Sequence, residues 1–325
     1  MMSPLPTLSQ IESAAAIVYQ SMQATPQYTW PLLAKRLGTQ VWLKHENHTP
    51  TGAFKVRGGL VYLEGLARRQ PDCSGIVSAT RGNHGQSLAF AARRYRIPTT
   101  IVVPHGNSLE KNAAMRAFGA ELIEYGNDFQ EASEHAAALA AQRGLHRVPS
   151  FHLDLVSGVA TGWLEMFRAA PDLDAVFVPI GLGSGICAAA AARAALGRKF
   201  KLIGVVSAHA PAYALSIAAH RAIEAPVSTR LADGMACRTP DPKALEIMFS
   251  EVDEVVQVTD LEVAGAMKAI YLDTHNVAEG AGAASLAAAI KLANDRPDAI
   301  IGKQIGLTLC GGNVDHDMFA GVLNG

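Results

Sequence analysis

A lysine between two apolar residues is the first feature of the chain that could do chemistry. Lys55 stands between Phe54 and Val56 in the segment Thr-Gly-Ala-Phe-Lys-Val-Arg-Gly. Such a lysine is either a solvated charge at the start of a helix or a desolvated amine. Desolvation lowers the pKa of an amine, which can then form a Schiff base with a carbonyl compound. Taken alone, Lys55 is better interpreted as a solvated charge. Two further segments make the desolvated amine the better interpretation.

A glycine-rich turn, Gly-Leu-Gly-Ser-Gly, follows the apolar run 175–179. Its members are Gly181, Leu182, Gly183, Ser184 and Gly185. Backbone N–H groups without side-chain bulk at the start of a helix suit a phosphate, although a tight turn without a ligand has the same composition. A dinucleotide site needs GxGxxG and an acidic residue at the end of the next strand. Here the loop is GxGxG and the next strand ends at Val206-Ser207, so a lone phosphate fits better.

A polar turn follows the apolar run 75–79 and consists of Thr80, Arg81, Gly82, Asn83 and His84. Open α/β sheets bind their ligands at the carboxyl ends of strands, where both this turn and the glycine-rich turn stand. Two such turns on two lobes predict a ligand cleft between the lobes.

Strands alternate with helices along the whole chain, which predicts mainly parallel sheets covered by helices on both faces. The expected strands are 41–45, 75–79, 99–103, 121–124, 175–179, 201–206, 254–258 and 304–309. The expected helices are 83–95, 109–118, 129–143, 185–196, 260–271 and 281–292. We expect a small lobe at 74–150, inserted into a large lobe made of 1–73 and 151–325.

Composition excludes several classes of protein. Of the 325 residues, 49% are hydrophobic and 18% charged, which argues against disorder, and a net charge of −1 removes the electrostatic footprint of a nucleic-acid binder. The four cysteines have no CxxC spacing, so neither a zinc site nor a disulfide framework is expected. The first 16 residues do not resemble a signal peptide, and no apolar stretch is long enough to span a bilayer. We expect a soluble cytoplasmic protein.

Six segments together resemble the pyridoxal 5′-phosphate (PLP) enzymes of fold type II. In order along the chain they are 51–58, 80–85, 181–185, 232–234, 279–282 and 309–313. His84 after Gly82-Asn83 is similar to the serine/threonine dehydratase branch. The resemblance implies an α/β fold like that of tryptophan synthase β, with two open twisted parallel-sheet domains, and a homodimer. It also implies that no C-terminal regulatory domain follows Asn313, as in a catabolic enzyme.

The resemblance also implies a role for each site residue. Lys55 holds PLP and, once released by the substrate amine, takes the Cα proton. The other cofactor-binding residues are Phe54, Asn83, Gly181, Leu182, Gly183, Ser184, Gly185, Gly234 and Cys310. The residues at the substrate carboxylate are Thr80, Arg81, Gly82, Asn83 and His84. Cys310 faces the pyridine nitrogen, or else is a plain core thiol.

Two positions depart from the family pattern. Arg81 stands where many dehydratases have a small residue, and we expect it to form an ion pair with another loop, the alternative being contact with substrate. Val206 and Ala212 stand where metal-dependent relatives have acidic ligands, so we expect no metal site.

The sequence therefore predicts a PLP-dependent dehydratase that converts a β-hydroxy amino acid, threonine or serine by default, to a 2-oxo acid and ammonia. The alternatives are a dehydratase for a bulkier substrate, phenylserine-like or hydroxyectoine-derived, an amino acid racemase, and a non-catalytic PLP-binding sensor.

Overall fold

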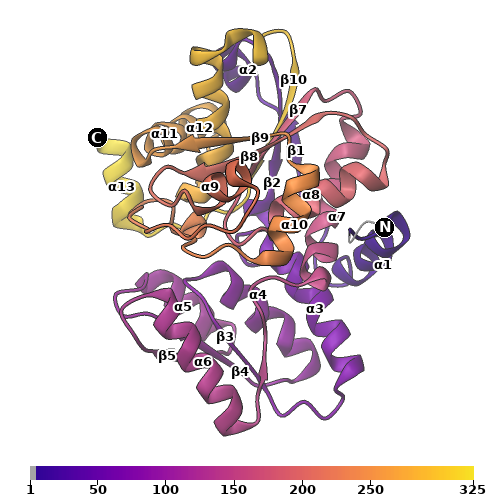
Figure 1. The fold of residues 1–325 in the computed structure, drawn as a ribbon, viewed down its shortest axis with the longest axis vertical. Helices are drawn as coiled ribbons and strands as arrows, with labels where there is room; N and C mark the ends of the chain where they lie inside the picture. The colour runs from indigo at the N-terminus through magenta and orange to yellow at the C-terminus, as the bar shows by residue number, and fades with distance from the viewer. Residues whose placement is uncertain (1–4) are drawn as a thin grey trace.

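Two sheets form the framework of the molecule, whose computed structural model describes residues 5–325 (Figure 1). The first four residues of the segment considered for a signal peptide lie outside this range. One sheet has six strands in the order β1-β2-β10-β7-β8-β9, and the other has four in the order β5-β4-β3-β6. All neighbours pair in parallel except β1 and β2. The predicted α/β fold of parallel sheets is confirmed.

Most of the central strands are short runs rich in apolar residues, whereas β1, β5 and β6 are more polar. The six-stranded sheet contains β1 (Gln27–Thr29), β2 (Gln40–His45), β7 (Ala175–Pro179), β8 (Lys201–Ser207), β9 (Glu254–Val258) and β10 (Gln304–Leu309). The four-stranded sheet contains β3 (Ile76–Ala79), β4 (Thr99–Val103), β5 (Glu121–Glu124) and β6 (His146–Arg147). All residues of β4 are buried, as expected for a parallel strand covered on both faces.

Thirteen α-helices connect and cover these strands in the described part of the chain. They are α1 (Leu8–Val18), α2 (Pro31–Leu37), α3 (Lys55–Arg69), α4 (Asn83–Ala92), α5 (Leu109–Ala117), α6 (Phe129–Arg143), α7 (Leu153–Ala169), α8 (Ser184–Ala195), α9 (Ala212–Ala219), α10 (Pro242–Glu251), α11 (Asp260–Thr274), α12 (Gly280–Asp295) and α13 (His316–Asn324). Four short 3₁₀ turns are η1 (Glu46–His48), η2 (Arg93–Tyr95), η3 (Asp233–Met235) and η4 (Pro297–Ala299).

The predicted helix 83–95 is shorter in the structure. Regular α-helix ends at Ala92, and the 3₁₀ turn η2 covers the remaining residues 93–95. The left-handed conformation of Arg96, with φ of 56°, then ends η2. The predicted helix 260–271 instead continues to Thr274. Helices α1, α2, α3, α7, α9, α10 and α13 were not predicted.

Helices cover both faces of the six-stranded sheet. Helix α12, backed by α11, packs on one face, and α8, backed by α7, packs on the other. The consecutive alanines of α8, from Ala188 to Ala192, are fully buried, so they serve close helix packing. Within residues 5–325 no helix combines the length and the hydrophobicity needed to cross a membrane.

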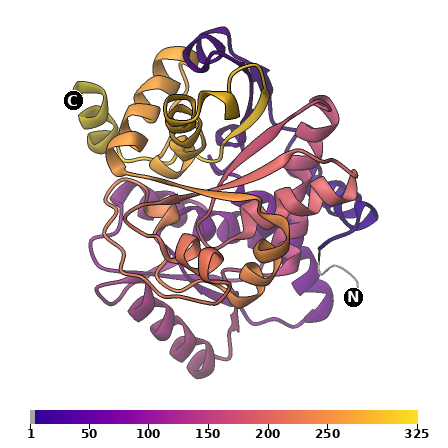
Figure 2. The same cartoon turned by 45° about the horizontal axis from the view of Figure 1, so that its top comes forward.

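Helix α3 joins the parts of the molecule that contain the two sheets, which lie one above the other in Figure 1 and overlap in the tilted view of Figure 2. It packs against α4, which covers the four-stranded sheet, and against α7, on the side of the six-stranded sheet. The crossing with α7 is close because it is made of glycines: a Cβ at Gly158 would lie 2.2 Å from the carbonyl oxygen of Arg57. The first turn of α3 is thereby seated directly on α7.

Candidate functional site

A cavity of about 660 Å³ lies at the carboxyl ends of β3 and β7. Its lining includes Lys55, the polar turn 80–84, Lys111, Gly181, Leu182 and most of 233–239. The predicted lysine, polar turn and first residues of the glycine-rich turn therefore share one cavity between the two sheets.

Lys55 is the first residue of α3, and its amine opens into this cavity. The preceding residue, Phe54, donates its backbone N–H to the carbonyl oxygen of Cys310 at 3.0 Å, and Ser87 Oγ donates to the carbonyl oxygen of Lys55 at 2.6 Å. The Lys55 Nζ lies 4.7 Å from the centre of the Phe54 ring. Burial lowers the pKa of Lys55, although Cys310 and Glu279 oppose that shift. Burial therefore favours the neutral form of this amine, which is the form that a nucleophile or base requires.

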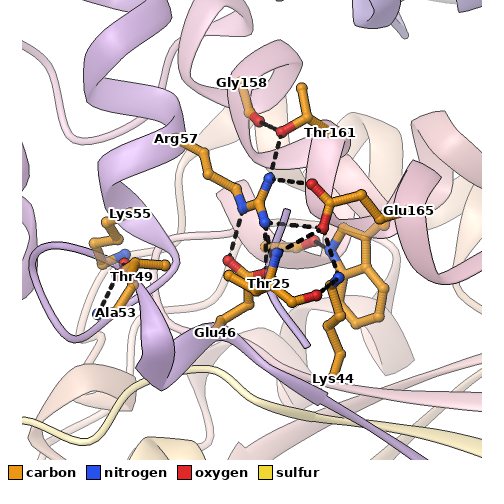
Figure 3. Close-up of polar contacts among 12 residues, drawn as sticks. Thr25, Lys44, Glu46, Thr49, Ala53, Lys55, Arg57, Gly158, Thr161 and Glu165 are labelled. Carbon is orange, nitrogen blue, oxygen red and sulfur yellow. Dashed lines mark hydrogen bonds and ion pairs between the residues drawn. The ribbon is translucent and has the colours of Figure 1, made fainter. Parts of the chain in front are cut away.

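A buried ion network holds the first turn of α3 in place (Figure 3). The guanidinium of Arg57, with no exposed surface, donates from Nε to Glu46 Oε2 at 2.8 Å and from Nη1 to Glu165 Oε1 at 2.7 Å. Lys44 Nζ adds a 2.5 Å bond to Glu165 Oε2. Two cations thus neutralise two carboxylates from η1 and α7. The sequence analysis missed this network, although Lys44 and Glu46 at the end of a buried strand were a signal for it.

The polar turn presents backbone donors to the cavity. Gly82 caps α4 without any side-chain hydrogen bond to the first turn, and its own N–H donates to Thr80 Oγ1 at 3.1 Å. The N–H groups at the start of a helix are unsatisfied donors at the positive end of its dipole, which suits a carboxylate. His84 lines the cavity beside them, and its Nε2 is buried without a hydrogen-bond partner in the described chain. Burial, with Lys55 adding to it, lowers the pKa of His84 to about 3, so the imidazole is neutral.

Asn83 connects the polar turn to the opposite wall. Its Nδ2 donates to Glu279 Oε1 at 2.6 Å, and its Oδ1 accepts from Asn313 Nδ2 at 2.8 Å. Burial raises the pKa of Glu279, a shift that Lys111 opposes from 3.6 Å. Lys111 itself forms a 2.6 Å ion pair with Asp233. Sequence reasoning gave no role to Lys111, Asp233, Glu279 or Asn313, although three of them stand in segments that it quoted.

The glycine-rich turn ends at the N-terminus of α8. Gly183 is the N-cap, with φ of 100°, and gives no side-chain hydrogen bond to the first turn, so these N–H groups can bind an anion. Gly181 must be glycine because a Cβ there would lie 2.3 Å from the carbonyl oxygen of Gly234, which also lines the cavity. Gly183 and Ser184 do not line the large cavity.

A second, much smaller cavity adjoins the α8 turn, with Phe54, Gly185 and Cys310 in its lining. Cys310 is a free, buried thiol whose pKa is raised by burial and by Glu279, so it stays protonated. A primary amine, a helix N-terminus lined by glycines and a neutral thiol are the groups that PLP needs for its aldehyde, phosphate and ring nitrogen. The partnerless His84 Nε2 and the uncapped turn of α8 leave polar groups for a ligand, and the residues present fit PLP.

Arg81 lines the large cavity, and no residue from 5 to 325 forms an ion pair or hydrogen bond with its side chain. The predicted ion pair with another loop is therefore wrong for the described chain. Two acidic residues that line the same cavity already have partners. Asp233 pairs with Lys111, and Asp128 accepts from the backbone N–H of Glu131.

The loop after β8 provides no acidic side chain at the positions considered for a metal. Val206 and Ala212 are both buried apolar residues at the end of β8 and the start of α9. Because hard cations need oxygen ligands, we expect EDTA to leave turnover unchanged and magnesium not to raise it, as measured by initial rates after dialysis. A several-fold activation by magnesium that chelation reverses would contradict this prediction.

The chain is similar to PLP-dependent enzymes over most of its length. The family model described as pyridoxal-phosphate dependent enzyme matches residues 18–311. The L-threonine ammonia-lyase of Thermotoga maritima is 32% identical over 98% of this chain and 78% of its own length. The enzyme of the same name from Geobacter sulfurreducens is 37% identical over 87% of this chain and 69% of its own.

The fold has a close counterpart among solved structures. The processed form of threonine deaminase isoform 2 from Solanum lycopersicum superposes with a TM-score of 0.89 at 26% identity, covering 98% of this chain and 94% of that one. Fold, cavity and sequence similarity agree, and the chain belongs to the PLP-dependent enzymes of fold type II, in their serine/threonine dehydratase family.

Proposed function

We propose that this protein is an ammonia-lyase that removes the β-hydroxyl group and the amino group of a 3-hydroxy amino acid. The products are a 2-oxo acid and ammonia, 2-oxobutanoate from threonine or pyruvate from serine. The observation that carries the proposal is the Lys55 amine, with a lowered pKa, opening into a cavity that also contains the uncapped N-terminus of α4.

Each residue has a proposed task around the bound cofactor. PLP supplies the electron sink that accepts the electron pair left at the substrate Cα. Lys55 in its neutral form takes the Cα proton. The first-turn N–H groups of α4 and the Thr80 hydroxyl hold the substrate carboxylate, and the first turn of α8 holds the phosphate. Cys310, a neutral thiol, does not protonate the ring nitrogen, which favours expulsion of a β-substituent over chemistry that needs a stronger sink.

The test is a panel of 3-hydroxy amino acids with two readouts. The L- and D-isomers of threonine and serine, together with bulkier members such as phenylserine, are incubated with the holoenzyme. We expect a stoichiometric 2-oxo acid and ammonia from at least one of them. An inverted amino acid without 2-oxo acid would instead indicate a racemase, and neither product from any member would indicate a PLP-binding sensor.

We propose the division into a large lobe, 1–73 with 151–325, and a small lobe, 74–150. The strands of the four-stranded sheet all lie between residues 76 and 147, which supports it. We also propose a cytoplasmic homodimer that acts on a small amino acid and binds neither nucleic acid nor membrane. The net charge of −1 supports the absence of a nucleic-acid partner. Sedimentation equilibrium of the holoenzyme tests the dimer.

A further inference from the structure

Three permanently charged side chains, Arg81, Lys111 and Arg238, line the large cavity, and two of them have acidic partners. Lys111 Nζ lies 2.6 Å from Asp233, and Arg238 Nε lies 4.0 Å from Glu224. Arg81 has no partner among residues 5–325. Arg81 is partly buried at the cavity wall, so its guanidinium is available to an anion that enters the cavity with a ligand.

The α-carboxylate of an amino acid does not require this guanidinium. The polar turn already offers the first-turn N–H groups of α4, because Gly82 leaves them uncapped. The cofactor phosphate likewise has its own donors in the turn before α8, where Gly183 leaves the first turn uncapped. The α-carboxylate and the cofactor phosphate therefore have their own donors. The guanidinium of Arg81 remains free to bind a third anionic group.

The cavity has acidic groups that could compete for Arg81, and each is engaged elsewhere. Asp233 is paired with Lys111, and Glu224 faces Arg238. Asp128 caps α6 by accepting from the N–H of Glu131 at 2.9 Å. His84, the neighbouring titratable group, is neutral. The cavity extends from Lys55 to the segment around Arg238, which leaves room for a substrate side chain beyond the reacting carbons.

We propose that Arg81 binds a carboxylate on the side chain of the substrate, so that the preferred substrate is a 3-hydroxy amino acid with a second acidic group. This inference rests on the proposed function and specifies its substrate class. The planar guanidinium matches a carboxylate in two parallel hydrogen bonds, which a neutral amide of the same shape cannot form equally well. In the net reaction the Cα proton and the β-hydroxyl leave, water replaces the amine, and 3-hydroxyaspartate gives oxaloacetate and ammonia.

The first experiment compares an acid with its isosteric amide. With wild-type holoenzyme, kcat/KM for 3-hydroxyaspartate exceeds that for 3-hydroxyasparagine by about ten- to a hundredfold, the effect of one charge-assisted contact. In Arg81→Ala this ratio falls to near one, and Arg81→Lys restores part of it. Arg238→Ala is the matched control, since Arg238 lines the same cavity but has a partner, and it keeps the wild-type ratio.

A binding measurement separates this inference from the proposed reaction. Aspartate and asparagine lack the β-hydroxyl leaving group, so their dissociation constants, from calorimetry on the holoenzyme, do not depend on turnover. Aspartate binds more tightly than asparagine by a similar factor, and Arg81→Ala removes the difference. If that holds while no 3-hydroxy acid yields a 2-oxo acid, the inference about Arg81 stands and the dehydratase proposal fails.

Two outcomes would overturn the inference. Equal losses for the acid and the amide in Arg81→Ala would assign Arg81 to the α-carboxylate. A lowered melting temperature with an unchanged acid-to-amide ratio would make Arg81 structural, as the sequence had led us to expect.

Discussion

Replacing Lys55 with alanine removes the visible absorption of the holoenzyme and lowers kcat by at least about 10²–10⁴-fold, the contribution of a positioned acid–base group. The reason is the role proposed for Lys55, whose amine would both hold PLP and act as the base. Burial at the cavity wall lowers the pKa of Lys55, whereas the pKa of Lys111, the other lysine of the same lining, is raised by its acidic partners Glu279 and Asp233. Absorption spectra and initial rates with a 2-oxo acid readout measure the two effects together.

The matched control is Lys199→Ala, since Lys199 is an exposed lysine that does not line the cavity. It should keep both the spectrum and the rate of the wild type. A Lys55→Ala protein with the native spectrum and normal turnover would remove Lys55 from the mechanism.

Replacing Arg57 with methionine destabilises the protein by about 3–5 kcal/mol, because it leaves the carboxylates of Glu46 and Glu165 buried with only Lys44 nearby. At present burial would raise the pKa of Glu165, but Arg57 and Lys44 outweigh it and the pKa lies below its ordinary value. The charge of Glu165 therefore depends on Arg57. Denaturant unfolding at neutral pH measures the change in the free energy of unfolding.

The control for Arg57→Met is a second arginine at the C-terminal end of the same helix, α3. Arg69 pairs with Asp154 at 2.9 Å, but its side chain is 51% exposed, so Arg69→Met should change stability by less than about 1 kcal/mol. If Arg57→Met does not yield folded protein, the milder Glu165→Gln takes its place and should still cost more than Arg69→Met. Equal stabilities of Arg57→Met and Arg69→Met would mean that the buried network does not stabilise the fold.

The local sequence pattern was sufficient to predict most strands but not to predict several of the helices. The bounds of β4, β5, β7, β9 and β10 agree with the prediction, because each has consecutive apolar or β-branched residues at its centre. Helix α7 was not predicted because it contains Gly158, Gly162 and several β-branched residues, which are poor helix formers. Its stability comes from packing against α3 and α8, and no local pattern encodes that packing.

The same division applies to the site. Lys55 and the two turns are each recognisable from a few consecutive residues, and the structure places Lys55, the polar turn and the first two residues of the glycine-rich turn at one cavity. Their partners are distant in sequence: Asn83 meets Glu279 across 196 positions, and Arg57 meets Glu165 across 108. The expected ion pair of Arg81 failed for the same reason, because a partner can be assigned only when the whole cavity wall is known.

The glycine crossing between α3 and α7 makes the enzyme vulnerable at a place remote from its chemistry. One added methyl group at position 158 would meet the Arg57 carbonyl oxygen at 2.2 Å, so the first turn of α3 would have to move, and Lys55 with it. No residue of α7 lines the large cavity. A survey of inactivating natural variants that examined only residues touching ligand would therefore overlook position 158, where a single methyl group displaces the helix turn that carries Lys55.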